Sequence, residues 1–157
     1  MSSSNSPTGG DILARRNDAT WNKQTLPDLN DVLIIEDETF DADRLQATIN
    51  IILGREVSVR RAATLGSALD RVLEAMPDMV FLDDYLKPND DASQTIPLLR
   101  RAGYEGPIVV ISGEVDRRRE ADLKAAGAIA ALHKENVDSG SVTEALNAAF
   151  SSAPSEQ

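Results

Sequence analysis

The sequence contains no cysteine in its 157 residues, which excludes disulfides, thiolate metal sites and cysteine nucleophiles. Aromatic residues are scarce, at 4%, and include a single tryptophan. Basic residues are outnumbered, since 16 Lys and Arg stand against 26 Asp and Glu and give a net charge of −10. This charge argues against a surface that binds nucleic acid.

No apolar run is long enough to cross a bilayer, and the Ser/Gly/Pro-rich start lacks the basic and apolar regions of a signal peptide. We therefore expect a cytoplasmic protein without a membrane partner. The length fits one domain with some surplus. We assign residues 1–28 to a partly disordered N-terminal arm, residues 29–150 to the domain and residues 151–157 to a C-terminal tail. Trp21 in the arm either packs back on the domain, which we favour, or anchors a partner.

Two apolar segments end in acidic residues. Residues 79–82 form a short apolar run typical of a fully buried strand, and Asp83 and Asp84 follow it. Residues 31–35 are largely apolar and β-branched and lead into the acidic run 36–38. An acid after one strand is as often a turn residue. If both strands are parallel in one sheet, however, their acids meet at one edge, where clustered carboxylates repel one another unless they bind a cation such as Mg²⁺.

Strands and helices alternate from residue 31 onward. The apolar pattern predicts strands at 31–35, 57–59, 79–82, 108–111 and 129–132. It predicts helices at 41–53, 64–76, 94–101, 116–126 and 141–150. Five such repeats predict an α/β fold with a five-stranded parallel sheet and helices on both faces.

Local signals indicate how two of the helices begin. Thr64 is expected to cap the second helix, whose apolar face would include Leu73 and Met76. The segment 116–126 carries three arginines in its first turn, where the helix dipole disfavours cations. We therefore expect that segment to be the weakest helix and a mobile element.

Two further helix starts are predicted from proline and capping patterns. A polar loop at 87–93 should precede a helix in which Pro97 is tolerable because it lies in the first turn. Ser141 and Glu144 have the spacing of a capping box for the last helix.

Four of the predicted strands end in groups that suit phosphoryl transfer to a carboxylate. The two acidic strand ends can hold Mg²⁺ and supply the attacking carboxylate. Ser112 offers a hydroxyl and Lys134 an ammonium for the phosphoryl oxygens. Either residue alone would more often have a structural role, but the four strand ends together, in this order, are a specific indication of phosphoryl transfer to a carboxylate.

With these residues in this order, the chain resembles the receiver domain of two-component response regulators. The resemblance covers about residues 31–150 and rests on residues 32–38, 77–83, 107–113, 127–128 and Lys134. It implies a flavodoxin-like (βα)5 fold and an aspartate that is phosphorylated by a histidine kinase or a histidine phosphotransfer protein. It also implies Mg²⁺ as cofactor, and a homodimer is compatible with it.

Matched position by position, the resemblance implies a complete phosphorylation site. Asp83 would be the phosphoacceptor. The metal ligands would be Glu36, Asp37, Asp83 and the backbone carbonyl of Tyr85, and the groups that bind the phosphoryl group and switch with it would be Ser112, Gly113 and Lys134.

Three positions depart from the family pattern. The proline usually found four residues after the phosphoacceptor is Pro88, which is five after Asp83 and four after Asp84. Either the loop has one extra residue or the acceptor is Asp84; the segment before Asp83 fits without a gap and favours Asp83. Ala131 replaces the usual switch aromatic, and Glu135 replaces the proline after the conserved lysine. These changes concern the output coupling rather than the phosphorylation chemistry.

The expected function is that of a single-domain response regulator, because only residues 151–157 follow the last helix. It would act as a messenger, a relay or a phosphate sink, and would be no enzyme beyond promoting its own phosphorylation and dephosphorylation. One alternative is a pseudo-receiver that binds partners without phosphorylation. A remote alternative is a haloacid-dehalogenase-like phosphatase, but Tyr85 stands where such an enzyme has its second acid, and the length leaves no room for a cap domain.

Overall fold

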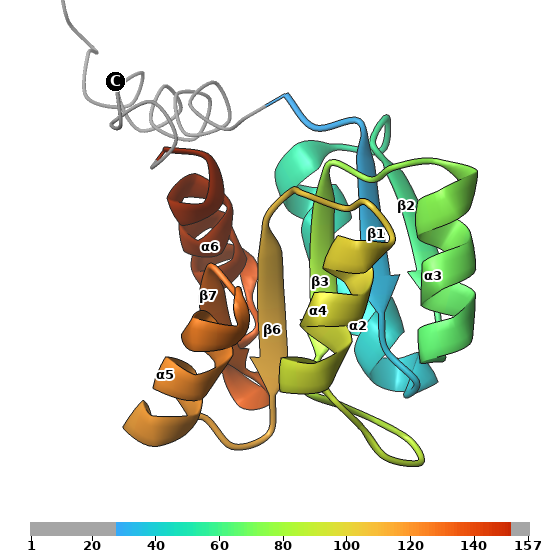
Figure 1. Cartoon of the computed structure of the whole chain (residues 1–157). Coiled ribbons are helices and arrows are strands. Elements are labelled where there is room, and N and C mark those ends of the chain that lie inside the picture. The colour runs from blue at the N-terminus through green and yellow to red at the C-terminus, as the bar shows by residue number, and fades with distance from the viewer. Residues whose placement is uncertain (1–27, 152–157) are drawn as a thin grey trace, which may run out of the picture.

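Five parallel strands form the centre of the computed structural model, which describes residues 28–151 (Figure 1). The strands are β1 (Asp31–Ile35), β2 (Ser58–Ala62), β3 (Met79–Asp83), β6 (Ile108–Ser112) and β7 (Ala130–His133), in the spatial order β2-β1-β3-β6-β7. This is the five-stranded parallel sheet that the repeat pattern predicts, with the flavodoxin-like fold that the family resemblance implies. All five strands end at the same edge of the sheet (Figure 1).

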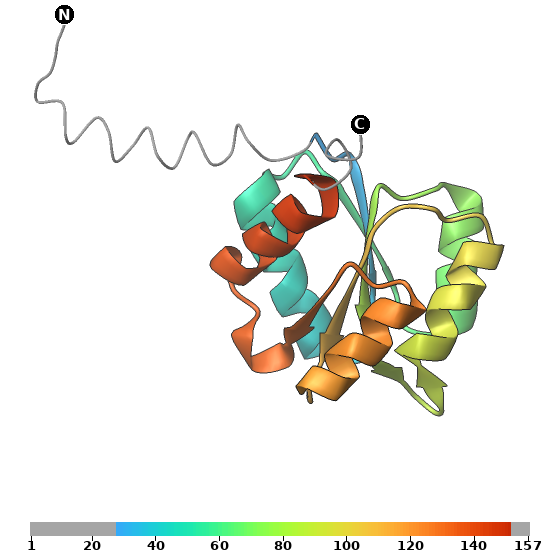
Figure 2. The same ribbon diagram turned by 60° about the vertical axis from the view of Figure 1, so that its left-hand side comes forward.

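Helices cover both faces of this sheet, as predicted. They are α2 (Thr39–Leu53), α3 (Leu65–Glu74), α4 (Ala92–Arg101), α5 (Arg117–Ala126) and α6 (Ser139–Ser151). Helices α2 and α6 lie on one face, and α3, α4 and α5 lie on the other (Figure 2). Each face has its own apolar half-core, so that Ile34 packs with α2 and α6, whereas Ile35 packs with α3, α4 and α5.

The position of each strand in the sheet explains its composition. β3 and β6 are buried at every residue because both faces and both edges are covered, and a continuous apolar run is favoured there. β2 is an edge strand, as predicted, although it extends further along the chain than its alternating residues suggest. It carries Arg60 and Arg61, and Arg60 pairs with Asp31 of β1 at 2.8 Å.

The loop after β3 differs from the prediction. It contains a small antiparallel hairpin, β4 (Tyr85–Leu86) and β5 (Asp90–Asp91), beyond the carboxyl edge of the sheet (Figure 1). Helix α4 therefore begins at Ala92, where Asp91 caps it by accepting the N–H of Ser93 at 2.8 Å. Pro97 lies in the second turn rather than the first, so its predicted place was wrong.

The start of α6 also differs from the prediction. Asp138 and Ser141 form the capping box of this helix. Asp138 Oδ1 accepts the N–H of Ser141 at 2.8 Å, and Ser141 Oγ accepts the N–H of Asp138 at 3.1 Å. The predicted box of Ser141 with Glu144 was wrong, because the helix begins before Ser141. Because the Asp138 carboxylate is also a good acceptor for a capping hydrogen bond, the Ser-x-x-Glu pattern alone does not locate the start of this helix.

Helix α3 follows its predicted start but not its predicted face. Thr64 caps it, with reciprocal hydrogen bonds to Ser67. Leu73 and Met76 were expected in the core but are 68% and 50% exposed, because the helix ends at Glu74 and its buried stripe is narrow. Within residues 28–151, none of the helices has the length and apolarity needed to cross a membrane. Trp21 lies outside the described residues.

Candidate functional site

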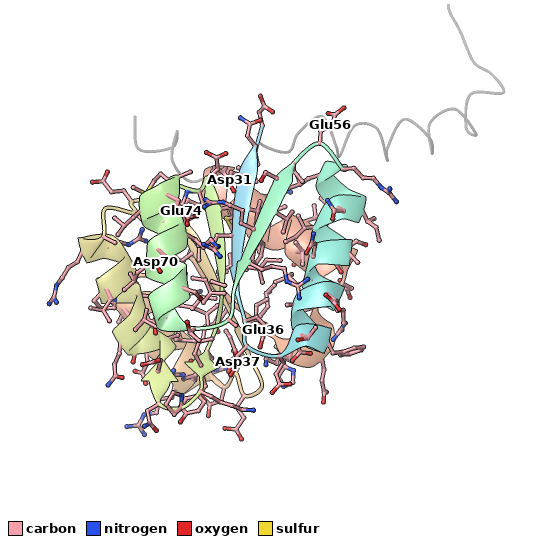
Figure 3. The ribbon with its side chains drawn as sticks, turned by 90° about the vertical axis from the view of Figure 1, so that its right-hand side faces the viewer. Asp31, Glu36, Asp37, Glu56, Asp70 and Glu74 are labelled. Carbon is pink, nitrogen blue, oxygen red and sulfur yellow. The ribbon has the colours of Figure 1, made fainter. Side chains whose placement is uncertain are left out.

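The candidate site lies at the carboxyl edge of the sheet, where β1, β3, β6 and β7 end. Figure 3 shows Glu36 and Asp37 at the end of β1 opposite to Asp31. An open pocket of about 430 Å³ is present at this edge. Its lining residues are Asp37, Glu38, Asp83, Asp84, Tyr85, Lys87, Ser112, Gly113, Glu114 and Lys134.

Glu36, Asp37 and Asp83 form an acidic cluster, as predicted. Each offers a carboxylate oxygen, and these oxygens lie within 4.8 Å of one another. Glu36 and Asp83 are only 9% and 5% exposed. They come together because β1 and β3 are parallel neighbours that end at the same level, with Ile35 paired to Leu82.

Burial and mutual repulsion perturb these acids. Burial, followed by the neighbouring Asp83 carboxyl, raises the pKa of Glu36 to about 8. Burial also raises the pKa of Asp83. Partial burial acts in the same direction on Asp37, but the backbone N–H of Lys87, 3.1 Å from Asp37 Oδ2, and smaller neighbouring contributions hold its pKa below the ordinary value.

This donor set fits a hard divalent cation. Three carboxylates converge from two strand ends, two of them are buried, and the pocket beside them admits water. Carboxylate oxygens with room for waters are the environment that Mg²⁺ prefers. The main-chain N–H of Tyr85 donates to Asp83 Oδ1 at 3.3 Å, so the residue whose carbonyl is expected to bind the cation contacts the acidic cluster.

Lys134 lies where the sequence predicted, beside the buried acids. Its Nζ is 3.5 Å from Glu36 and from Asp83, and 3.3 Å from Asp41. Partial burial acts to lower the pKa of Lys134, but the attraction of Asp83 and Glu36, with Asp41, outweighs it and raises that pKa. The ammonium therefore stays charged and partly balances the acidic cluster.

Helix α2 supports Lys134 at both ends, a role that sequence reasoning missed. Asp41 contacts the ammonium, and Arg44, one turn later, donates to the carbonyl oxygens of Lys134 and Val137 at 3.2 and 3.1 Å. Arg44 thereby closes the turn that carries Lys134 and Glu135. The one sequence feature that could have indicated the role of Asp41 is its position about one helical turn after the acidic run. No sequence feature indicates the role of Arg44.

Asp84 does not join the acidic cluster. Its two oxygens are bound by Arg119 of α5, which also pairs with Asp91 at 2.8 Å. The hydroxyl of Ser112 donates to Asp84 Oδ2 at 2.7 Å. Neighbouring side chains of an extended segment point in opposite directions, which explains why Asp83 and Asp84 have different partners.

Three predicted positions thus have different outcomes. Gly113 lines the pocket, as the prediction requires. Ser112 lines it too, but its hydroxyl is engaged by Asp84 in this structure. Ala131 packs partly buried against the half-core of α3, α4 and α5 and offers no ring. Arg119 was missed, since an arginine in a charged helix gives no signal of where it will reach.

Comparison with known proteins identifies the family and the fold. Residues 32–147 match the family model for the response regulator receiver domain. A search of curated protein sequences gives no match. Because the structural neighbours described next are less than 25% identical to the chain, they support the fold alone.

Three solved structures illustrate this likeness. A two-component response regulator from Clostridium difficile is 16% identical with a TM-score of 0.67, and the match covers 78% of this chain and 96% of that one. NtrX from Brucella abortus is 20% identical with a TM-score of 0.71, covering 82% of this chain but only 28% of NtrX. A response regulator from Burkholderia pseudomallei, solved with a phosphorylated aspartic acid, calcium ion and citrate, is 22% identical with a TM-score of 0.66, covering 80% and 72%.

Proposed function

The chain belongs to the response regulator receiver domain family, and from this membership we propose that Asp83 accepts a phosphoryl group from a histidine kinase or a histidine phosphotransfer protein. The observation that carries the proposal is the surroundings of Asp83. This carboxylate is buried between two further acids, and the Lys134 ammonium lies 3.5 Å away. The Burkholderia relative, with its phosphorylated aspartic acid, supports the same chemistry.

In the proposed reaction, a carboxylate oxygen of Asp83 attacks the phosphorus of a phosphohistidine. The new O–P bond forms as the P–N bond breaks, and the imidazole leaves with the electron pair of that bond. Lys134 would balance the charge on the phosphoryl oxygens, and the N–H of Gly113 and the hydroxyl of Ser112, two residues that line the same pocket, would bind them. Glu36, Asp37, Asp83 and the Tyr85 carbonyl would hold Mg²⁺, which when bound neutralises charge on the transferring group.

The contacts of the two adjacent aspartates favour Asp83 over Asp84 as the acceptor. Both oxygens of Asp84 are engaged by Arg119, and one also accepts the hydrogen bond from Ser112. A carboxylate that is paired with a guanidinium is a poorer nucleophile, because its electron pairs are already bound. Asp83 instead faces the acidic cluster and Lys134.

We further propose that the protein acts by carrying the phosphoryl group, as a messenger, a relay or a phosphate sink, rather than by turning over another substrate. In this role it would promote its own phosphorylation and dephosphorylation. The lifetime of the aspartyl phosphate separates these roles, since a messenger needs a longer one than a sink. It can be measured as the decay of the phosphorylated form after the donor is removed.

The primary test is intact-mass spectrometry after incubation with Mg²⁺ and a small-molecule phosphodonor such as acetyl phosphate. We expect one phosphoryl adduct that is stable in acid, is removed by hydroxylamine and does not form in EDTA. Asp83→Asn should abolish it, whereas Asp84→Asn should retain at least part of it. An adduct lost only in Asp84→Asn would move the acceptor to Asp84. A wild-type protein that gains no adduct from either a small donor or a kinase would be a pseudo-receiver.

A further inference from the structure

The Ser112 hydroxyl, which should bind the phosphoryl group, already has a strong partner. It is buried, at 2% exposed, and donates to Asp84 Oδ2 at 2.7 Å. The carbonyl oxygen of Glu114 is a second acceptor at 3.0 Å, but a hydrogen bond to a carboxylate is roughly twice as strong as one to a neutral group. The single hydroxyl proton therefore points to Asp84 rather than toward Asp83.

Asp84 is itself held in place by an arginine. Arg119 binds both carboxylate oxygens, with Nε 3.1 Å from Oδ2 and Nη2 on Oδ1. The same Nη2 is 2.8 Å from Asp91, the residue that caps α4. The Asp84 side chain is only 14% exposed. This network ties the ends of β3 and β6 to α5 and to the start of α4.

We propose, on the basis of the function proposed above, that Asp84 is a positioning residue that keeps the Ser112 hydroxyl away from Asp83, so that a phosphoryl group on Asp83 must take this hydroxyl from Asp84. Arg119 moderates the competition, because its guanidinium partly neutralises Asp84 and weakens its hold on the hydroxyl proton. The coupling is reciprocal: whatever favours the bond between Ser112 and Asp84 disfavours the phosphorylated state, and phosphorylation releases one partner of the network that Arg119 makes with α4 and α5.

The test measures the affinity for beryllofluoride, a non-covalent mimic of the phosphoryl group, by calorimetric titration in Mg²⁺. Asp84→Asn preserves shape and removes the charge that attracts the hydroxyl, and we expect about tenfold tighter binding, the effect of one charge-assisted hydrogen bond. Removing a negative charge near an anion would also tighten binding without any role for Ser112. The same substitution is therefore made in a Ser112→Ala background, where the gain should shrink to twofold or less.

Equal gains from Asp84→Asn in both backgrounds would overturn the proposal, because the effect would then be one of charge alone. Asp84→Ala serves as a second variant should Asp84→Asn fold poorly, and it should give a gain of the same sign. Arg119→Gln should weaken beryllofluoride binding more in the wild-type background than in Ser112→Ala, because it leaves the full charge of Asp84 to hold Ser112. The matched control is Arg118→Gln, which removes the same charge from an exposed side chain of the same helical turn. Equal losses in the two arginine variants would contradict the role of Arg119.

Failure of the function proposed for Asp83 is recognised separately. If wild-type protein binds no beryllofluoride, or if Asp83→Asn binds it as well as wild type, then Asp83 is not the acceptor and the proposal for Asp84 is overturned with it. If wild type binds and Asp83→Asn does not, the acceptor is supported, and the comparison of the two backgrounds alone decides the role of Asp84.

Discussion

Glu36 illustrates how one buried side chain affects the whole site. It is 9% exposed, lies beside Asp83 and has a pKa raised to about 8, chiefly by burial. In the unfolded chain its ordinary value is 4.5, so between these two pH values the folded protein binds more protons than the unfolded one. Glu36 therefore lowers the stability of the metal-free protein as the pH rises.

The prediction is that metal-free protein in EDTA loses stability from pH 5 to pH 8, and that Glu36→Gln removes on the order of 2 kcal/mol of this loss. The amide keeps the shape of the protonated acid and cannot ionise. Urea denaturation at several pH values measures the free energy of unfolding. Glu105→Gln, which alters an exposed acid remote from the pocket, is the control. An equal pH dependence in wild type and Glu36→Gln would contradict this prediction.

Sequence reasoning found the acidic cluster and Lys134 but missed Arg44 and Arg119. The first group was predictable because parallel strands end at one edge, so that position after a strand suffices to place a side chain. The two arginines instead extend to the site from α2 and α5, the helices that flank the sheet. Arg44 binds a carbonyl 90 residues away, and Arg119 binds a carboxylate 35 residues away. No periodicity specifies such contacts.

Helix α5 buries little apolar surface and has several charged contacts. Leu123 is its one fully buried side chain, Asp116 caps it by accepting the N–H of Arg119 at 2.7 Å, and Arg119 ties its first turn to Asp84. A helix that buries little apolar surface reorders at low cost. That the charged segment is the mobile element therefore stays a prediction, and the hydrogen bonds of its first turn oppose such motion.

Phosphorylation is therefore predicted to change amide hydrogen exchange most in residues 113–126 and in the loop 85–93, with little change near Ala131. The physical reason is that Ser112 leaves Asp84 while Ala131 has no ring to move. Exchange measured by mass spectrometry with and without the phosphodonor tests this, with Asp83→Asn treated identically as control. Changes concentrated in β7 and α6, with 113–126 silent, would instead indicate a route through strand β7.

Helix α4 contains a proline in its interior, which gives a second prediction for an element. Pro97 cannot donate an N–H to the carbonyl of Ser93, and its exposed position means that little packing compensates. Pro97→Ala should stabilise the protein by about 1 kcal/mol. The free energy gained from the restored helical hydrogen bond should exceed the entropic cost of a more flexible unfolded chain. Urea denaturation measures it, with the exposed Gln94→Ala of the same helix as control. A loss of stability would show that the proline ring is needed.

The hairpin β4–β5 shows why the start of α4 was misplaced. Each of its strands has two residues, which is too short for any alternation to be visible in the sequence. By contrast, the central strands β3 and β6 were found because burial on both faces leaves continuous apolar runs. The start of a helix was predictable where the sequence offers one N-cap residue, as at Thr64. It was not predictable where two residues could serve as the cap, as at Asp138 and Ser141.

For the molecule as a whole, a net charge of −10 and an acidic cluster with two buried members lead us to expect that stability depends on cations. A cation that binds only the folded state stabilises it by about 2.7 kcal/mol at one hundred times its dissociation constant. We predict that Mg²⁺ raises the urea midpoint more at pH 8 than at pH 6, because at the lower pH it must displace the proton held by Glu36.

Sodium chloride at equal ionic strength is the control for this prediction, since salt alone screens the repulsion of a charged molecule. Asp37→Asn should lose most of the Mg²⁺-specific effect. A midpoint that rises equally with both salts would mean that the acidic cluster does not bind the cation.

The sheet that separates the two half-cores also makes neighbours in the sequence independent of each other. Ile34 and Ile35 are adjacent in the chain, yet their side chains pack in different half-cores, on opposite faces of the sheet. Cavities made by Ile34→Val and Ile35→Val should therefore have additive costs, each about 1 kcal/mol, in a double-mutant cycle. Such independence allows the face under α2 and α6 to accumulate substitutions over generations while the face under α3, α4 and α5 keeps its packing. Evolution can then alter one side of the protein without having to rebuild the other.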